Sequence, residues 1–182
     1  MDEIGPAGAV RPLLRVHQVR EFTDEPVEPA ALDAIADAAR WSGSGSNSQP
    51  WRFIVIRTAE TLRLLSEASP PSTRSLATAA AAVAIVLPQE KGAAVPNAYD
   101  EGRAAERILI AAFLLHLGGG IAWVKADDRP MVRELLGVPE DRFVRTVVAI
   151  GHPTALARKP KSTHGEARLP RSETVFSERW EG

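Results

Sequence analysis

Hydrophobic positions in the first third of the chain follow a helical period. After "EPVEP", apolar side chains recur at i, i+3, i+4 and i+7, at Leu32, Ile35, Ala36 and Ala39. Pro29 stands near the first turn, and Gly43 and Gly45 follow soon after Trp41. Because proline is tolerated in the first helical turn and glycine breaks a helix, the pattern predicts an amphipathic helix that ends near Trp41.

Three later segments are apolar in a way that is typical of strands. Residues 51–57, "WRFIVIR", are β-branched and aromatic, and Thr58 then offers an N-cap for a helix that carries Leu62 and Leu65. Residues 81–88 and 143–153 are almost continuously apolar and end in proline. Unbroken apolar runs of this length indicate strands that are buried on both faces.

The longest helical candidate runs from Ala98 to Leu117, and we expect the glycines at 118–120 to end it. Residues 120–124 form a brief strand or extended segment, and a short helix begins at Asp128 and stops at Gly137. This order predicts an α+β fold, an α/β/α sandwich in which helices flank a mixed, mainly antiparallel central sheet.

Composition and charge narrow the class of protein. The 182 residues are 45% hydrophobic, which is enough for one domain spanning 1–182. With 22 Lys and Arg against 23 Asp and Glu, the net charge of -1 gives no field to hold a nucleic acid. The N-terminus lacks the apolar stretch of a signal peptide, and the apolar run 79–87 is shorter than the roughly 20 residues that cross a membrane. We therefore expect a cytoplasmic protein with no membrane partner.

The last thirty residues, 153–182, differ from the rest in composition. They are rich in charge and proline and have few apolar residues before Val175, Phe176 and Trp180. Composition alone favours a disordered tail. The apolar end, however, is costly to leave in water, and this favours an arm that packs on another surface, such as that of a second chain.

The loop "WSGSGSNSQPW", residues 41–51, is the richest candidate for binding chemistry. It offers hydroxyl and amide groups beside two glycines, a combination that suits a planar ligand with many polar atoms. An ordinary helix-to-strand connection has the same composition. Hydrolase and metalloenzyme motifs such as HExxH, GxSxG and GxxxxGK[ST] are absent, and the chain has no cysteine.

Four motifs in the same order resemble the FMN-dependent nitroreductase family. They are "VREF" with "NSQPWRFIVI", then "DEGRAAERILIAAFLLHLGGGIAW", then "LLGVPEDRFVRTVVAIGHP", and finally "RLPRSETVFSERW". The resemblance covers the chain from Arg15 onward. It implies a homodimer in which the arm of each chain reaches round the other and two FMN molecules lie at the interface.

The resemblance also assigns site residues. It implies that Gln18 and Arg20 lie near the FMN phosphate and ribityl chain, and that Arg168 closes on the phosphate. It implies that Ser44 and Asn47 of the loop approach the flavin from the partner subunit, and that Gln49 of the same loop is a further cofactor contact. The segment Lys125–Ala126 falls where the family presents a backbone N–H to flavin N5.

Two further positions are open to more than one interpretation. Arg74 falls near the family's cation that faces flavin N1 and O2, although a solvated loop arginine is an equally good reading. The first basic residue of the family's N-terminal motif is replaced by Val16. One phosphate contact is therefore lost unless Arg15 or His17 supplies it. Trp51 and Trp123 border strands, so we expect both in the core.

The activity implied is an oxidoreductase that takes hydride from NADH or NADPH onto FMN and passes it to a nitroaromatic, a quinone or an enone in a ping-pong cycle. The same scaffold is compatible with dehalogenation, flavin fragmentation or reduction by a deazaflavin. The alternative from another functional class is a homodimer that binds flavin but catalyses no reaction. Its support is the replacement of the family's basic residue by Val16.

Overall fold

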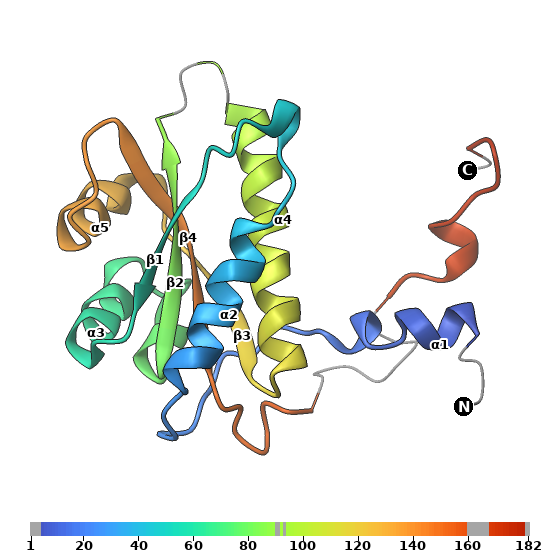
Figure 1. Cartoon of the computed structure of the whole chain (residues 1–182), viewed down its shortest axis with the longest axis horizontal. Helices are drawn as coiled ribbons and strands as arrows, with labels where there is room; N and C mark the ends of the chain where they lie inside the picture. Colours follow the sequence, from blue (N-terminus) through green and yellow to red (C-terminus); the bar gives the residue numbers. More distant parts are fainter. Residues whose placement is uncertain (1–4, 90–91, 93, 160–167, 181–182) are drawn as a thin grey trace.

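A computed structural model describes residues 5–89, 92, 94–159 and 168–180 of the chain. Its centre is a four-stranded antiparallel sheet with the strand order β1-β2-β4-β3 (Figure 1). The strands are β1 (Arg52–Ile56), β2 (Ala81–Pro88), β3 (Gly118–Trp123) and β4 (Arg142–Gly151). Parallel pairing among the described residues is confined to an isolated bridge between Gln18 and Gly119. The predicted α+β sandwich with a mainly antiparallel sheet is confirmed.

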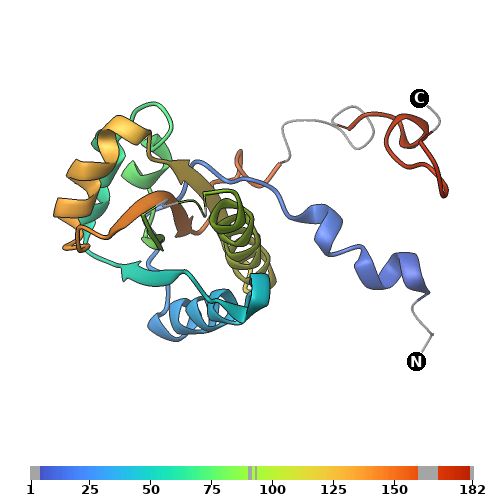
Figure 2. The same cartoon turned by 90° about the horizontal axis from the view of Figure 1, so that it is seen from above.

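Helices cover both faces of the sheet. The helices are α2 (Pro29–Arg40) and α4 (Ala94–Leu114) on one face, and α3 (Ala59–Ala68) and α5 (Arg129–Leu135) on the other. Figure 2 shows these two layers on opposite sides of the strands. Each helix turns an apolar face to the sheet, as the spacing of Leu32, Ile35 and Ala39 in α2 illustrates.

The two central strands explain why the sequence there is almost purely apolar. Along β2, odd-numbered residues such as Val83 pack with α2 and α4, while even-numbered residues such as Ala84 pack with α3 and α5. Successive side chains of a strand point to opposite faces, so a strand between two helix layers needs apolar residues at every position. The predicted burial of residues 81–88 and 143–153 on both faces is confirmed for β2 and β4.

The glycines at 118–120 form part of β3, so the prediction that they end the long helix was wrong. Helix α4 begins four residues before the expected Ala98, and it ends at Leu114, with His116 in the left-handed region at φ 61°. A side chain at Gly120 would collide with the carbonyl oxygen of Val19. Gly120 is therefore required because another backbone segment crosses β3 in close contact.

Two smaller predictions were also wrong. Thr58 precedes α3 as expected, but its side chain makes no capping hydrogen bond. Trp123 is 47% exposed, whereas Trp51 is 4% exposed and lies in the core as predicted. The difference arises because Trp51 packs in the core cluster with α2 and α4, whereas Trp123 ends β3 and lines a cavity beside α4.

Both ends of the described chain extend away from the sheet on the same side (Figure 1, Figure 2). The N-terminal helix α1 (Pro6–Val10) and the short 3-10 helices at Leu13–Arg15 and Arg171–Glu173 contain no buried residue. Part of the predicted arm, residues 160–167 and 181–182, lies outside the described residues. The ends that are described have almost no core of their own.

Candidate functional site

The segment that follows the N-terminal helices crosses the edge of β3. The Val19 N–H donates to the carbonyl oxygen of Gly119 over 2.9 Å, and the Ile121 N–H donates to Oε1 of Gln18 over 2.7 Å. Further along, the Phe22 N–H donates to Oγ1 of Thr78 over 3.3 Å. These contacts place residues 18–22 between β3 and the segment that contains Arg74. The side-chain oxygen of Gln18 is already used in holding the strand edge.

Two predicted cations are exposed in this region. Arg20 and Arg74 make no ion pair or side-chain hydrogen bond within the part of the chain that the structure describes. His17 differs from them, because its ring nitrogens lie 3.0 Å from the carbonyl oxygen of Arg15 and 3.2 Å from that of Ala157. His17 thus ties the N-terminal segment to the start of the C-terminal arm.

The turn that follows β3 is held by the buried hydroxyl group of Ser69. The Lys125 N–H donates to Oγ of Ser69 over 3.0 Å, and Nζ of Lys125 donates to the carbonyl oxygen of Pro70 over 3.0 Å. Within the described residues the Ala126 N–H has no acceptor, and Ala126 is exposed. Of the two predicted backbone donors, only that of Ala126 is therefore available to a ligand.

The loop between α2 and β1 has an unusual backbone. Ser46, Asn47 and Gln49 all have positive φ, at 50°, 54° and 46°. Non-glycine residues with positive φ are uncommon and cluster at functional sites, although asparagine tolerates this conformation well. The Gln49 N–H donates to Oγ of Ser44 over 2.9 Å, and Nε2 of Gln49 donates to Oδ1 of Asn47 over 3.2 Å. The predicted loop residues thus contact one another.

Helix α4 anchors this loop. The Gly45 N–H donates to Oδ2 of the buried Asp100 over 3.1 Å, and Arg103 lies 3.6 Å from Oδ1 of the same carboxylate. A side chain at Gly43 would collide with the guanidinium of Arg103. The loop is fixed to α4, whereas the 125–126 turn is fixed to the segment after α3. The two predicted sets of ligand contacts therefore occupy separate places on one chain.

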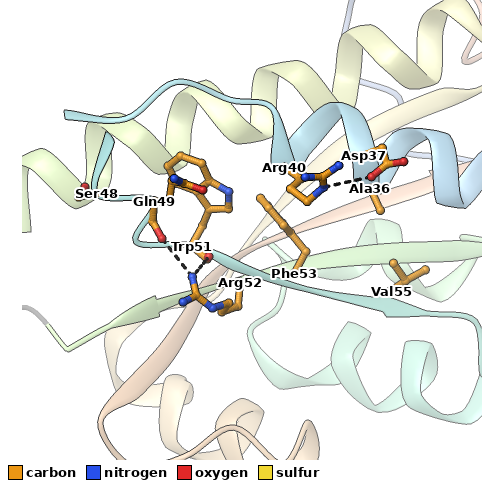
Figure 3. Close-up of a pocket in the computed structure, with 9 residues that line it drawn as sticks. All are labelled: Ala36, Asp37, Arg40, Ser48, Gln49, Trp51, Arg52, Phe53 and Val55. Carbon is orange, nitrogen blue, oxygen red and sulfur yellow. Dashed lines mark hydrogen bonds and ion pairs between the residues drawn. The ribbon is translucent and has the colours of Figure 1, made fainter. Parts of the chain in front are cut away.

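A groove of about 660 Å³ lies between α2 and the edge strand β1. Figure 3 shows Phe53 and Val55 lining it from β1, Trp51 just before that strand, and Ala36 and Arg40 lining it from α2. The polar groups on its rim are already paired. Nε of Arg40 lies 3.1 Å from Asp37, and Arg52 donates to the carbonyl oxygens of Gln49 and Trp51. The groove does not include Arg20, Arg74 or the 125–126 turn.

A second cavity of about 180 Å³ lies between α4 and the strands β3 and β4. Its lining includes Trp123 and a buried ion pair between Glu101 and Arg145, where Nε of Arg145 donates to Oε2 of Glu101 over 2.7 Å. Arg145 occupies the register shift between β2 and β4, where β4 has one additional residue. The bulge directs this guanidinium to α4 instead of to solvent.

The remaining predicted residue, Arg168, is exposed at the start of the described C-terminal segment. Within the described ranges, no three His, Cys, Asp or Glu side chains lie close enough together to hold a metal ion. None of the described helices is both long enough and apolar enough to cross a membrane.

Known proteins resemble the chain in sequence. The model of the nitroreductase family matches residues 17–91. A protein of Archaeoglobus fulgidus, provisionally named NADH dehydrogenase/NAD(P)H nitroreductase, is 37% identical over 145 residues, which cover 77% of this chain and 79% of that protein. The chain belongs to the nitroreductase family. It is therefore an oxidoreductase of the nitroreductase type.

Other nitroreductase relatives agree in sequence and in fold. An NADH dehydrogenase of Thermus thermophilus is 27% identical to this nitroreductase, with 77% of this chain and 84% of that protein covered. The solved structure of an FMN-dependent nitroreductase of Clostridium difficile has a TM-score of 0.80 and 25% identity, and the match covers 93% of this chain and 98% of that one. The resemblance inferred from the four motifs is confirmed.

Sequence reasoning missed the residues that hold the site segments in place. Ser69, Thr73 and Asp100 gave no local signal, because each bonds a partner whose position only the fold determines. Asp128 was identified as the start of a helix, but its side chain makes no capping bond there and instead accepts from Oγ of Ser69 over 2.6 Å.

Proposed function

We propose that this nitroreductase uses FMN to pass hydride from NADH or NADPH to a small organic acceptor. The observation that carries the proposal is the convergence of residues 18–22, 69–78 and 119–126. Hydrogen bonds join these segments, and Arg20, Arg74 and the open Ala126 N–H lie on them. The name of the Clostridium difficile relative, an FMN-dependent nitroreductase, supports the choice of flavin.

The residues present fit FMN. An exposed guanidinium suits a phosphate, because it binds two oxygens at once and stays charged. Arg20 and Arg168 take this role in the proposal, with Gln18 and His17 beside them. Arg74 supplies a positive charge for the ring, where it stabilises the electron density that reduction adds. Ser44, Asn47 and Gln49 contact the flavin of the partner subunit.

The protein contributes binding, orientation and electrostatics to the reaction. When bound, FMN supplies the hydride chemistry itself, accepting from the nicotinamide and donating to the acceptor in alternate half-reactions. The Ala126 N–H is a neutral donor at the proposed place of hydride transfer, and Arg74 is a cation beside it. The acceptor class we propose is a nitroaromatic, a quinone or an enone. The provisional name of the Archaeoglobus fulgidus relative supports both the nicotinamide donor and a nitro acceptor.

We also propose a homodimer with exchanged C-terminal arms. In a single chain the α4-anchored loop and the 125–126 turn occupy separate places, so a second copy is needed to bring both to one flavin. The groove beside β1 offers an apolar floor next to a strand edge, which is a common place for an added segment. Val175 and Trp180 of the partner's arm, 50% and 76% exposed here, are the proposed occupants.

The test is the absorbance spectrum of the purified protein, followed by NAD(P)H oxidation in the presence of a quinone and, separately, a nitroaromatic. A flavin spectrum together with acceptor-dependent oxidation supports the proposal. A protein that binds FMN without turnover supports the non-catalytic carrier instead. A protein that neither contains nor takes up FMN contradicts the cofactor and the reaction together.

A further inference from the structure

The hydroxyl group of Ser69 connects two loops that are far apart in the sequence. Ser69 is fully buried at 0% exposure. Its Oγ donates to Oδ2 of Asp128 over 2.6 Å and accepts from the Lys125 N–H over 3.0 Å. A serine hydroxyl has one hydrogen to donate, so the bond to the carboxylate fixes its direction and leaves its lone pairs for the amide.

Thr73 extends this arrangement toward Arg74. Thr73 is also at 0% exposure, and its Oγ1 accepts from the Ser69 N–H over 3.1 Å and donates to the carbonyl oxygen of Ser66 over 2.9 Å. Both ends of the 69–73 loop are thereby held against the end of α3. A buried polar network in which every member has a partner is rigid, because each broken bond leaves an unpaired group away from water.

The Asp128 carboxylate has no simpler structural role that explains this contact. It stands at the N-cap of α5, yet it makes no capping hydrogen bond. Its hydrogen bond is instead to Ser69, which lies 59 positions away in the sequence. Lys125 adds a second tie, because its Nζ donates to the carbonyl oxygen of Pro70. The Ser69 hydroxyl and the Pro70 carbonyl oxygen therefore hold Lys125 through its backbone and its side chain, immediately before the Ala126 N–H.

We propose that Ser69 and Asp128 are positioning residues that orient the Ala126 N–H toward the reacting edge of bound flavin. This inference rests on the proposed function. The Lys125 N–H is held by Ser69, and the Lys125 carbonyl oxygen accepts from the Asp128 N–H over 3.1 Å, so the peptides on both sides of Lys125 are held while the exposed Ala126 N–H has no acceptor within the described residues. A preorganised donor stabilises developing charge only when its direction is fixed before the reaction. The same network fixes the start of the segment that carries Arg74, so one buried hydroxyl sets the relative placement of both groups.

The experiment compares variants that remove the clamp with matched controls. Ser69→Ala removes both hydrogen bonds, and Asp128→Ala removes the acceptor alone. Asp128→Asn retains an acceptor oxygen for the Ser69 hydroxyl and acts as the conservative variant. Ser66→Ala removes a neighbouring buried hydroxyl that bonds only the carbonyl oxygen of Arg63 in its own helix. All four are measured with FMN bound.

The readouts are the rate of flavin reduction by NADH under anaerobic conditions, the midpoint potential and the thermal midpoint. We expect Ser69→Ala and Asp128→Ala to slow flavin reduction about tenfold. We also expect them to weaken binding of reduced relative to oxidised FMN by about tenfold, which is about 30 mV lower in potential. Asp128→Asn keeps most of the rate, and Ser66→Ala changes neither the rate nor the potential.

The outcomes separate this inference from the proposed function. Should wild-type protein bind no FMN, both are overturned. Should it bind and reduce FMN while Ser69→Ala and Asp128→Ala match Ser66→Ala in rate and potential, the positioning role alone is overturned. If Ser69→Ala does not fold, the comparison of Asp128→Ala with Asp128→Asn decides the inference, because Asp128 is only partly buried.

Discussion

Arg20 is an exposed cation that lacks an anionic partner within the described part of the chain, and Val16 replaces a further basic residue of the family motif. We therefore expect Arg20 and Arg168 to supply most of the charge that neutralises the FMN phosphate. Charge-assisted hydrogen bonds contribute about 1.5–3 kcal/mol each, so Arg20→Ala or Arg168→Ala weakens FMN binding roughly ten- to a hundredfold. The measurement is a titration of apo-protein with FMN.

Riboflavin is the matched ligand for this prediction, since it lacks the phosphate. Neither substitution changes riboflavin binding if the arginines act on the phosphate. Arg133→Ala, which removes a cation from α5 on the covered face opposite α4, controls for net charge. An equal loss of affinity for both ligands shows that the arginine supports the fold instead.

Asn47 combines a side-chain role with a backbone role, and the two need separating. Its φ is 54°, a conformation that alanine adopts at a cost, so Asn47→Ala weakens the loop as well as removing the amide. Asn47→Gly removes the amide and keeps the left-handed backbone. We expect Asn47→Gly to weaken FMN retention by about 0.5–1.5 kcal/mol, and Ser48→Ala to leave it unchanged. Equal FMN dissociation constants for the two variants contradict the role of the loop.

At the scale of elements, the crossing of residues 18–22 over β3 depends on Gly120. An added methyl group there meets the backbone of Val19, which cannot move without losing the bond from the Val19 N–H to Gly119. We predict that Gly120→Ala lowers the free energy of unfolding by about 1–3 kcal/mol or more. Urea denaturation measures it.

Gly102 is the matched control for this substitution. It lies within α4, and nothing lies within 4 Å of an added Cβ. Gly102→Ala stabilises the protein by about 0.5–1 kcal/mol, because glycine is a poor helix former. If Gly120→Ala lowers the free energy of unfolding and Gly102→Ala raises it, the close approach of the Val19 backbone, and not chain flexibility, explains the glycine at position 120. A Gly120→Ala variant with an unchanged free energy of unfolding contradicts the close crossing of residues 18–22 over β3.

The elements that local pattern determines could be predicted from the sequence. Helix α2 was predicted from the helical spacing of its apolar residues, and β2 from its unbroken apolar run. The core on the sheet faces explains both patterns. The glycines of β3 were misassigned because the requirement at Gly120 comes from Val19, some hundred positions away. Trp123 was misassigned because its burial depends on how the end of β3 packs beside α4. The motifs indicated Arg20 and the 125–126 turn, whose roles stay predictions, but the contacts of Ser69 with Asp128 exist only once the chain has folded.

At the scale of the whole molecule, exposed apolar residues gather on the two described ends of the chain and on the outer surface of α4. Large hydrophobic side chains are exposed at both ends and on the surface of α4: Leu13, Leu14, Val95, Tyr99, Leu114, Leu169, Val175 and Trp180. Monomeric proteins rarely leave so many of these groups in water. A second copy of the chain covers them in the proposed homodimer and at the same time unites the α4-anchored loop with the 125–126 turn.

The last prediction tests this assembly through the arm. Deleting residues 165–182 removes Val175, Phe176 and Trp180, so we expect monomeric or insoluble protein that no longer retains FMN. Val175→Asp with Trp180→Ser keeps the full length of the arm and is expected to weaken the dimer, because a charge cannot enter the apolar groove beside β1. Glu173→Ala, an exposed change on the same segment, leaves the dimer intact. Size-exclusion chromatography with light scattering measures the mass, and an unchanged, stable dimer after the deletion contradicts arm exchange.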